Sequence, residues 1–485
     1  MPVNLTAPLR WKTATADEQK MLKNLQGNIL KGHGRDQTWN IFFQLAGGSP
    51  TAIAASKRAL REIGNHHVTD AYTQLLTTEK FQTDGTDGGP FCAAFLSAAG
   101  YTALGLTFTP PAGNAVFGPG MKAPASLAQL ADPAVATWEA HYQKPIHGMI
   151  LIADFHIARG LNTVDEIITL LVTAGATIQH VQAGKSIRNA AGEGLEHFGY
   201  VDGRSQPLLL LEDIDDEAHT GIAHWDPTFP LSTALVPDPL GGDPLAFGSF
   251  FIFRKLEQEV AAFKHTEQKL ADTLGLTLDN RELAGAYVVG RFEDGTPTTT
   301  SAIPRGAKPG NDFDYKADPA AARCPFHAHI RKTNPRGAGG AEPEPAERLH
   351  IMPRRGITYE DVPRAVAPKD LPEARTLAEF ETRVLPLLPT KDVGLLFMAY
   401  NARLDQQFAF TQQTWANNLG FPLGVPPAGI DGVIGQGPNL PAGQQYPKSW
   451  DDPTKGTAPF DFHNFVHMKG GEYFFAPSIM FLRSL

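Results

Sequence analysis

The chain has 485 residues, of which 42% are hydrophobic and 19% charged, and this ordinary globular composition excludes wholesale disorder. Its formal net charge of −9 argues against a nucleic-acid partner, and its two cysteines, Cys92 and Cys324, exclude a disulfide framework. The sequence has no apolar run of about 18 residues and no signal-peptide core at its N-terminus, so we expect a cytoplasmic protein without a membrane span.

Strands and helices are predicted to alternate in a first block. Residues 39–45 (WNIFFQL) and 148–155 (GMILIADF) are typical of strands, and helical periodicity follows them at residues 52–63 and 163–172. Residues 214–248 are rich in proline, glycine and aspartate, which predicts a crossover between domains.

A second block repeats this pattern. Residues 249–254 (SFFIFR) predict a strand that runs into helical spacing at Leu256, and residues 287–291 predict another strand. Residues 394–400 (GLLFMAY) predict a buried strand. The helix predicted after it has one face formed by Leu404, Phe408, Thr411 and Trp415.

Two blocks of similar size predict an α+β fold with a duplicated architecture, although no repeat is visible at the level of single residues. The predicted N-terminal domain is residues 1–213, the crossover residues 214–248 and the C-terminal domain residues 249–485.

The long segment 296–353 is dense in proline, glycine, asparagine and charged residues, and segments of this kind are usually functional or disordered. Within it, residues 324–336 (CPFHAHIRKTNPR) present His327 and His329 as candidate metal ligands, although a loop histidine is more often solvated or hydrogen-bonded. Zinc is one alternative, through Cys324, His327 and His329 or through His463 and His467. The first set lacks a fourth ligand nearby, and the second lacks the glutamate of an HExxH motif.

Two other motifs supply an acid and a cation. Residues 199–203 (GYVDG) place Asp202 between two glycines, and Arg354 and Arg355 follow the histidines after a short loop. Taken singly, an Asp-Gly pair is more often a turn, and arginines are more often surface charges. Together with the histidine they indicate a redox cofactor site.

These segments resemble the dye-decolorizing peroxidase family. Residues 199–203 match its GxxDG motif, and residues 324–336 resemble the segment that carries its proximal histidine. The resemblance spans nearly the whole chain and is most similar to the larger, intracellular-type members. It continues in residues 25–30 (LQGNIL), 253–258 (FRKLEQ), 289–291 with 294–297 (VGR and DGTP) and 470–478 (GGEYFFAPS).

The resemblance implies two ferredoxin-like domains, with antiparallel sheets flanked by helices. A haem b (iron protoporphyrin IX) is then expected in a cavity formed mainly by the C-terminal domain. It implies that His329 ligates the iron, that Asp202 is the distal aspartate and that Arg354 is the distal arginine. The cofactor would be contacted by His329, Arg354, Gly203 and Arg204.

Two supporting residues are also predicted around this site. Arg355 is the alternative to Arg354 as the distal arginine, or else its supporting neighbour. A ligating imidazole is expected to donate its other N–H to a carboxylate or carbonyl, and Asp405, early on the helix after residues 394–400, is the candidate acid.

The function implied is that of a haem-dependent peroxidase that reduces hydrogen peroxide and oxidises dyes or phenolic substrates in one-electron steps. One alternative is a haem-handling protein that removes iron or carries the cofactor. The other is a cofactor-free binding module on the same fold. Small aromatic molecules or dyes are the expected partners, and a homo-oligomer is compatible with the sequence.

Overall fold

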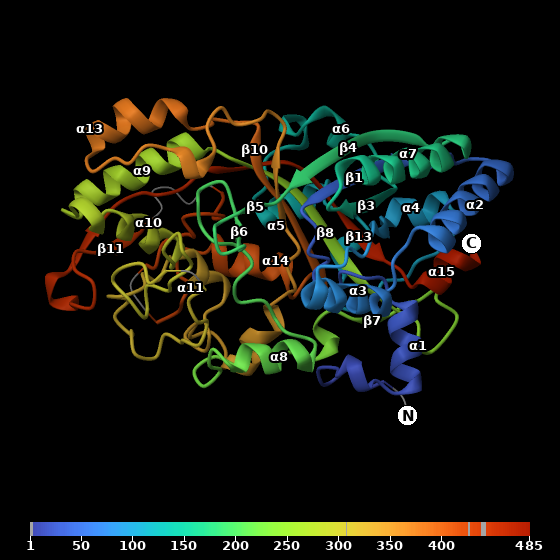
Figure 1. Ribbon diagram of the computed structural model, residues 1–485, viewed down its shortest axis with the longest axis horizontal. Helices are drawn as coiled ribbons and strands as arrows, with labels where there is room; N and C mark the ends of the chain where they lie inside the picture. Colours follow the sequence, from blue (N-terminus) through green and yellow to red (C-terminus); the bar gives the residue numbers. More distant parts are fainter. Residues whose placement is uncertain (1–2, 307, 425–426, 438–442) are drawn as a thin grey trace.

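One large antiparallel sheet runs through the computed structural model, which describes residues 3–306, 308–424, 427–437 and 443–485. Its strands follow each other in the order β4-β1-β3-β2-β13-β8-β10-β9. Figure 1 shows α2 (Pro50–His66) and α7 (Ile157–Thr173) at one end of the molecule and α9 (Val260–Thr273) and α10 (Glu282–Val289) at the other.

The first half of the sheet has the order expected of a ferredoxin-like βαββαβ unit. Helices α2 and α3 (Ala71–Asp84) connect its first two strands, and α7 connects the last two. The strands are β1 (Gln37–Gln44), β2 (Phe91–Leu96), β3 (Gly148–Asp154) and β4 (Thr177–Lys185).

The second half repeats this order. When the strands of each half are numbered 1 to 4 along the chain, both halves read 4-1-3-2. The duplicated α+β architecture predicted from the sequence is therefore confirmed. The strands of this half are β8 (Phe247–Gln258), β9 (Ile357–Glu360), β10 (Val393–Asn401) and β13 (Val466–Ala476).

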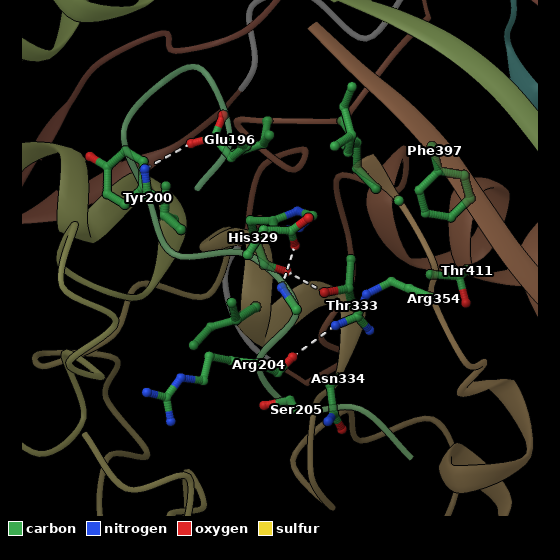
Figure 2. Close-up of a pocket in the computed structure, with 18 of the residues that line it drawn as sticks. Glu196, Tyr200, Arg204, Ser205, His329, Thr333, Asn334, Arg354, Phe397 and Thr411 are labelled. Carbon is green, nitrogen blue, oxygen red and sulfur yellow. Dashed lines mark hydrogen bonds between the residues drawn. The ribbon is translucent and has the colours of Figure 1, made fainter. Parts of the chain in front are cut away.

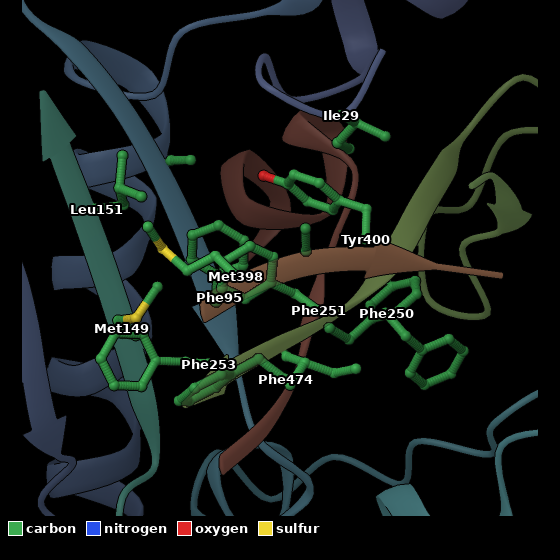
Figure 3. Close-up of a cluster of buried hydrophobic side chains, with 14 of the residues drawn as sticks. Ile29, Phe95, Met149, Leu151, Phe250, Phe251, Phe253, Met398, Tyr400 and Phe474 are labelled. Atoms are coloured by element: carbon green, nitrogen blue, oxygen red, sulfur yellow. The ribbon is translucent and has the colours of Figure 1, made fainter. Parts of the chain in front are cut away.

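The two halves meet at both edges of their sheets. On one side β2 pairs with β13 at Leu96 and Phe475, and on the other the Thr358 hydroxyl of β9 donates a hydrogen bond to the Lys185 carbonyl of β4. Between them lies an aromatic core in which Phe95 stacks on Phe251 with ring centroids 4.2 Å apart (Figure 3). Burial of each such ring contributes about 2–3 kcal/mol, so the core binds the halves together.

The longer helices begin and end where their sequences direct. Ser49 caps α2 through its hydroxyl and Pro50 is its first residue, while Asp70 caps α3. Helix α3 ends at Gly85, whose φ of +75° is readily adopted by glycine. The other helices are α1 (Ala16–Asn24), α4 (Ala98–Ala103), α5 (Pro124–Leu130), α6 (Ala140–Gln143), α8 (Leu211–Ala218), α11 (His329–Thr333), α12 (Glu344–Glu347), α13 (Leu377–Glu379), α14 (Phe408–Phe410) and α15 (Ile479–Ser484).

Short strands complete the fold at its periphery. Strand β7 (Val236–Pro237) pairs with β8, and the remaining short strands form two small hairpins. These are β5 (Ile187–Arg188) with β6 (Gly194–Leu195), and β11 (Gln445–Pro447) with β12 (Thr457–Pro459). No helix among the described residues has the length and apolar character needed to cross a bilayer.

The predicted strands at residues 39–45, 148–155, 249–254 and 394–400 are confirmed as β1, β3, β8 and β10. The strand predicted at residues 287–291 is wrong, because most of that apolar run forms the buried helix α10.

Two other elements differ from the sequence prediction. The sequence predicts helical spacing from Leu256, but β8 continues to Gln258 before α9 begins. The helix predicted after β10 is a short one, α14, continued by the π-helical turn η10 (Thr411–Ala416). The division of the chain at residues 213 and 248 stays a prediction.

Candidate active site

A cavity of about 310 Å³ lies over the C-terminal half of the sheet, within the size range of small-molecule and cofactor sites. Its walls come from β8, β10, α11, η10 and from the loop that contains Asp202. The predicted residues Asp202, Gly203, Arg204, His329 and Arg354 all line it, although up to 152 positions separate them in the chain. Figure 2 shows Arg204, His329 and Arg354 around the cavity.

His329 is the first residue of α11, and its ring is fixed from behind. Its Nδ1 lies 2.8 Å from Oδ2 of Asp431, whose side chain is fully buried. Oδ1 of Asp431 accepts hydrogen bonds from the backbone N–H groups of Val433 (2.7 Å) and Ile434 (3.0 Å), so this carboxylate has a set orientation. With Nδ1 engaged and the side chain 28% exposed, Nε2 is left as the nitrogen that can bind a metal in the cavity.

Electrostatics support this arrangement. Burial alone would raise the pKa of Asp431. His329 and the two backbone donors lower it by more than burial raises it, so the net shift is downward. For His329, burial lowers the pKa, but the charge of Asp431 more than offsets this, so the pKa of His329 is raised. The ionised carboxylate therefore keeps the proton on Nδ1 and makes the imidazole a stronger donor.

The acid behind His329 is Asp431 rather than Asp405. The Asp405 carboxylate instead accepts hydrogen bonds from the backbone of Ala115 (2.8 Å) and Val116 (3.3 Å), at a turn of the N-terminal half. Asp405 does not lie on a helix: it stands in the turn before α14, and its carboxylate binds free backbone N–H groups at the start of the 3-10 helix at Ala115–Phe117.

Asp202 reaches the cavity from a tight loop. Gly199 (φ +104°) and Gly203 (φ +83°) adopt backbone conformations that favour glycine, which explains the glycines of the motif. The Asp202 N–H donates to the Gly194 carbonyl, and its Oδ1 accepts from the Gly203 N–H at 2.7 Å. Its exposed carboxylate otherwise faces the cavity.

Glu196 holds this loop in shape. Its carboxylate accepts hydrogen bonds from the backbone N–H groups of Phe198 (2.8 Å) and Tyr200 (2.9 Å) and from the side chain of Gln258. Burial raises its pKa to about 7.

Arg354 enters the cavity with few of its donors engaged. Its Nη2 donates to the Arg204 carbonyl at 2.8 Å (Figure 2). Its backbone N–H donates to the side chain of Gln206 at 3.0 Å. None of the ion pairs of the described residues includes it, so its charge remains available in the cavity.

Arg355 has a different role. Its guanidinium donates to the carbonyls of Asn28 (2.7 Å), Ile29 (3.0 Å) and Arg354 (2.8 Å). Arg355 therefore holds the N-terminal segment around Asn28 and Ile29 against the chain that leads into β9. It does not line the cavity.

Arg204 takes part in the site through its backbone carbonyl, and its charged side chain is engaged elsewhere. Its guanidinium donates to the Pro309 carbonyl and pairs with Glu193, while its own carbonyl accepts from Arg354.

A pair of arginines that the sequence did not single out as functional also lines the cavity. Arg291 and Arg336 are buried, and each donates to the side chains of Ser205 and Asn311. Neither forms an ion pair within the described parts of the chain, and burial lowers their pKa values to about 9 and about 10. Both lie in segments that carried the family resemblance, but an arginine in a motif does not by itself indicate two adjacent cations.

The zinc alternatives gain no support. No group of three or more histidine, cysteine, aspartate or glutamate side chains in the described ranges is arranged to hold a metal. His327 and Cys324 are buried, and His327 packs against Tyr446. His463 and His467 do not share a helix, because β13 begins at Val466.

No family model matches the chain. It is similar along its whole length to the multifunctional dye peroxidase DyP2 of Amycolatopsis sp. (strain ATCC 39116 / 75iv2), with 46% identity and 100% of each chain covered. The solved structure of DyP2 superimposes with a TM-score of 0.91 at 45% identity, again with 100% of each chain covered. A DyP-type peroxidase of Anabaena sp. has a TM-score of 0.87 at 37% identity and covers 99% of this chain and 98% of its own. A dye-decolorizing peroxidase in complex with 2,6-dimethoxyphenol has a TM-score of 0.70 at 28% identity, covering 96% of this chain and 98% of its own.

Proposed function

The chain belongs to the dye-decolorizing peroxidases, a class of haem-dependent enzymes, and from this membership we propose the residues that carry out the reaction and the molecules they act on. The proposal is that haem b binds in the cavity with His329 as its iron ligand. Asp202 and Arg354 then act on hydrogen peroxide, and phenols or dyes are the reductants. The observation that carries it is the convergence of these three side chains on one cavity.

The residues around the cavity fit such a cofactor. His329 offers one imidazole nitrogen, while apolar side chains such as Leu395, Phe397 and Val433 supply surfaces for a flat macrocycle. Haem carries two carboxylates, and Arg291 and Arg336 form a cationic wall in which neither guanidinium has an ion-pair partner among the described residues. When bound, haem supplies the redox chemistry: two electrons pass to hydrogen peroxide and are replaced one at a time by the reducing substrate.

His329 would hold the haem iron, and Asp431 would tune it as a ligand. The hydrogen bond from Nδ1 to an ionised carboxylate increases the electron donation of the imidazole, which favours the higher oxidation states of iron.

Asp202 and Arg354 divide the work on the peroxide. The carboxylate of Asp202 accepts a proton from one peroxide oxygen and delivers it to the other, so that water can leave. Burial lowers the pKa of Arg354, but a guanidinium stays protonated in proteins, so Arg354 stabilises the negative charge that develops as the O–O bond breaks. The short glycine-flanked loop and the hydrogen bond to the Arg204 carbonyl hold the two groups in place beforehand.

Membership in an enzyme family does not favour the haem-carrier or the cofactor-free alternative. For the reductant, the solved complex of a related enzyme with 2,6-dimethoxyphenol supports a phenolic substrate for this chain.

The test is steady-state oxidation of 2,6-dimethoxyphenol by the haem-loaded protein and hydrogen peroxide, comparing wild type with Asp202→Asn. Loss of the proton acceptor is expected to lower kcat/KM for peroxide by about 10²–10⁴-fold. Asp405→Asn is the matched control, because its carboxylate lies outside the cavity and activity is expected to stay at the wild-type level. Full activity in Asp202→Asn would contradict the assignment.

A further inference from the structure

A buried lysine lies one helical turn beyond His329. Lys332 belongs to α11 and is fully buried, and it forms no ion pair with any described residue. Its ammonium group donates hydrogen bonds to two backbone carbonyls, those of Asn418 (2.6 Å) and Gly429 (2.5 Å).

These two carbonyls belong to the chain around Asp431. Asn418 follows η10, and Gly429 lies in the proximal loop, which we define as residues 427–434. Because Gly429 is two residues before Asp431, Lys332 ties the helix that carries His329 to the loop that carries the acid.

A second contact joins the same two segments on the other side of His329. His327 is buried, packs against Tyr446 with ring centroids 4.4 Å apart, and its ring lies within hydrogen-bonding reach of the Ala428 backbone in the proximal loop. The His329–Asp431 hydrogen bond is thus flanked by one fastening two residues before His329 and another three residues after it.

Lysine is costly at this position. A buried ammonium without a carboxylate partner loses its hydration, and burial lowers the pKa of Lys332 to about 7. An apolar side chain of similar size would avoid that cost, so the two hydrogen bonds are what the lysine adds.

We propose that Lys332 is a positioning residue: with His327, it holds the proximal loop against α11 so that Asp431 keeps its hydrogen bond to His329 and sets the electron donation of the iron ligand. The inference rests on the proposed function only in taking His329 as the iron ligand.

Two variants test it, Lys332→Met and His327→Phe, each measured in the haem-loaded protein. The first readout is hydrogen–deuterium exchange of peptides covering residues 427–434, where about tenfold faster exchange is expected. The second is the Fe(III)/Fe(II) midpoint potential, which is expected to rise in both variants, because a weakened hydrogen bond to Asp431 leaves the imidazole a poorer donor.

Two controls frame the result. Asp431→Asn removes the anionic acceptor and should raise the potential at least as much. Lys255→Met removes another buried lysine, which pairs with Glu139 and Asp361 and does not line the cavity, and should leave the potential unchanged.

The outcomes separate positioning from charge. If Lys332→Met lowers the potential, its ammonium acts as a nearby charge and the proposal is overturned. Unchanged exchange in the proximal loop also overturns it. If Lys332→Met does not fold, His327→Phe carries the test, because it loosens the same loop and leaves the lysine in place.

Failure of the proposed function would be recognised separately. The exchange measurement can be repeated without haem, where the fastening of the loop does not depend on what His329 binds. Suppose that the two variants exchange faster than wild type without haem, while the haem spectra do not depend on His329. The role of Lys332 in holding the proximal loop would then stand, and the assignment of His329 as the iron ligand would be rejected.

Discussion

Replacing Arg354 and Arg355 one at a time distinguishes the roles of these two adjacent arginines. Only one of its side-chain nitrogens is hydrogen-bonded, to the Arg204 carbonyl, and the rest of the guanidinium faces the cavity. Arg355 instead has its three side-chain nitrogens engaged by backbone carbonyls. Arg354→Leu should therefore remove stabilisation of the developing charge, whereas Arg355→Leu should remove contacts that hold the N-terminal segment.

The magnitudes follow from these contacts. Loss of one donor that stabilises a developing anion costs about 3–4 kcal/mol of activation free energy, so Arg354→Leu should slow the reaction with peroxide by about 10²–10³-fold. Arg355→Leu should leave this rate within about threefold, since no charge is lost from the cavity, and should lower the free energy of unfolding by about 3 kcal/mol.

Stopped-flow absorbance of the haem-loaded protein mixed with hydrogen peroxide gives the second-order rate constant, and urea unfolding gives the stability. Equal rates in the two variants, or a larger loss of rate in Arg355→Leu, would refute the reasoning.

Two further predictions concern stability. Asp132→Ala leaves the buried Arg254 without its bidentate carboxylate partner (2.7 and 2.5 Å), so the free energy of unfolding measured in urea should fall by about 3–5 kcal/mol. The double variant with Arg254→Met should recover most of this loss, and no recovery would show that the buried charge is not its cause. Burial and the neighbouring Glu293 raise the pKa of Glu282 from 4.5 to about 7. The unfolded chain releases this proton near pH 4.5 and the folded chain only near pH 7, so the free energy of unfolding falls across that window, by up to about 3 kcal/mol. Glu282→Gln keeps the acceptor for the Glu293 N–H and should become more stable relative to wild type as the pH rises from 5 to 7. An equal difference in urea midpoint at both pH values would contradict this.

Much of the fold could be predicted because its strands are short apolar runs with helical periodicity after them. Residues 39–45 and 394–400 are examples, and both are buried strands. The failure at residues 287–291 has a physical reason. Helix α10 is buried on nearly all sides, so its sequence is uniformly apolar and lacks the period that distinguishes a helix from a strand.

For the candidate site too, some residues could be predicted from the sequence and others could not. Asp202, His329 and Arg354 stand in motifs, so the amino-acid sequence alone is enough to identify them as candidates. Asp431 could not be identified in this way, because it lies 102 positions from His329 within an ordinary Asp-Gly turn. Its role depends on the tertiary contact between α11 and the proximal loop, which no local pattern encodes. The same is true of Arg291 and Arg336, whose proximity results from their shared contacts with Ser205 and Asn311.

The central claim, that His329 holds haem iron in this cavity, is tested most directly by optical titration of the haem-free protein with haem, with wild type beside His329→Ala. The account predicts that wild type binds haem with the spectrum of a histidine-ligated iron. It also predicts that His329→Ala loses this spectrum and binds more weakly. An identical spectrum and affinity in the two proteins would contradict the account.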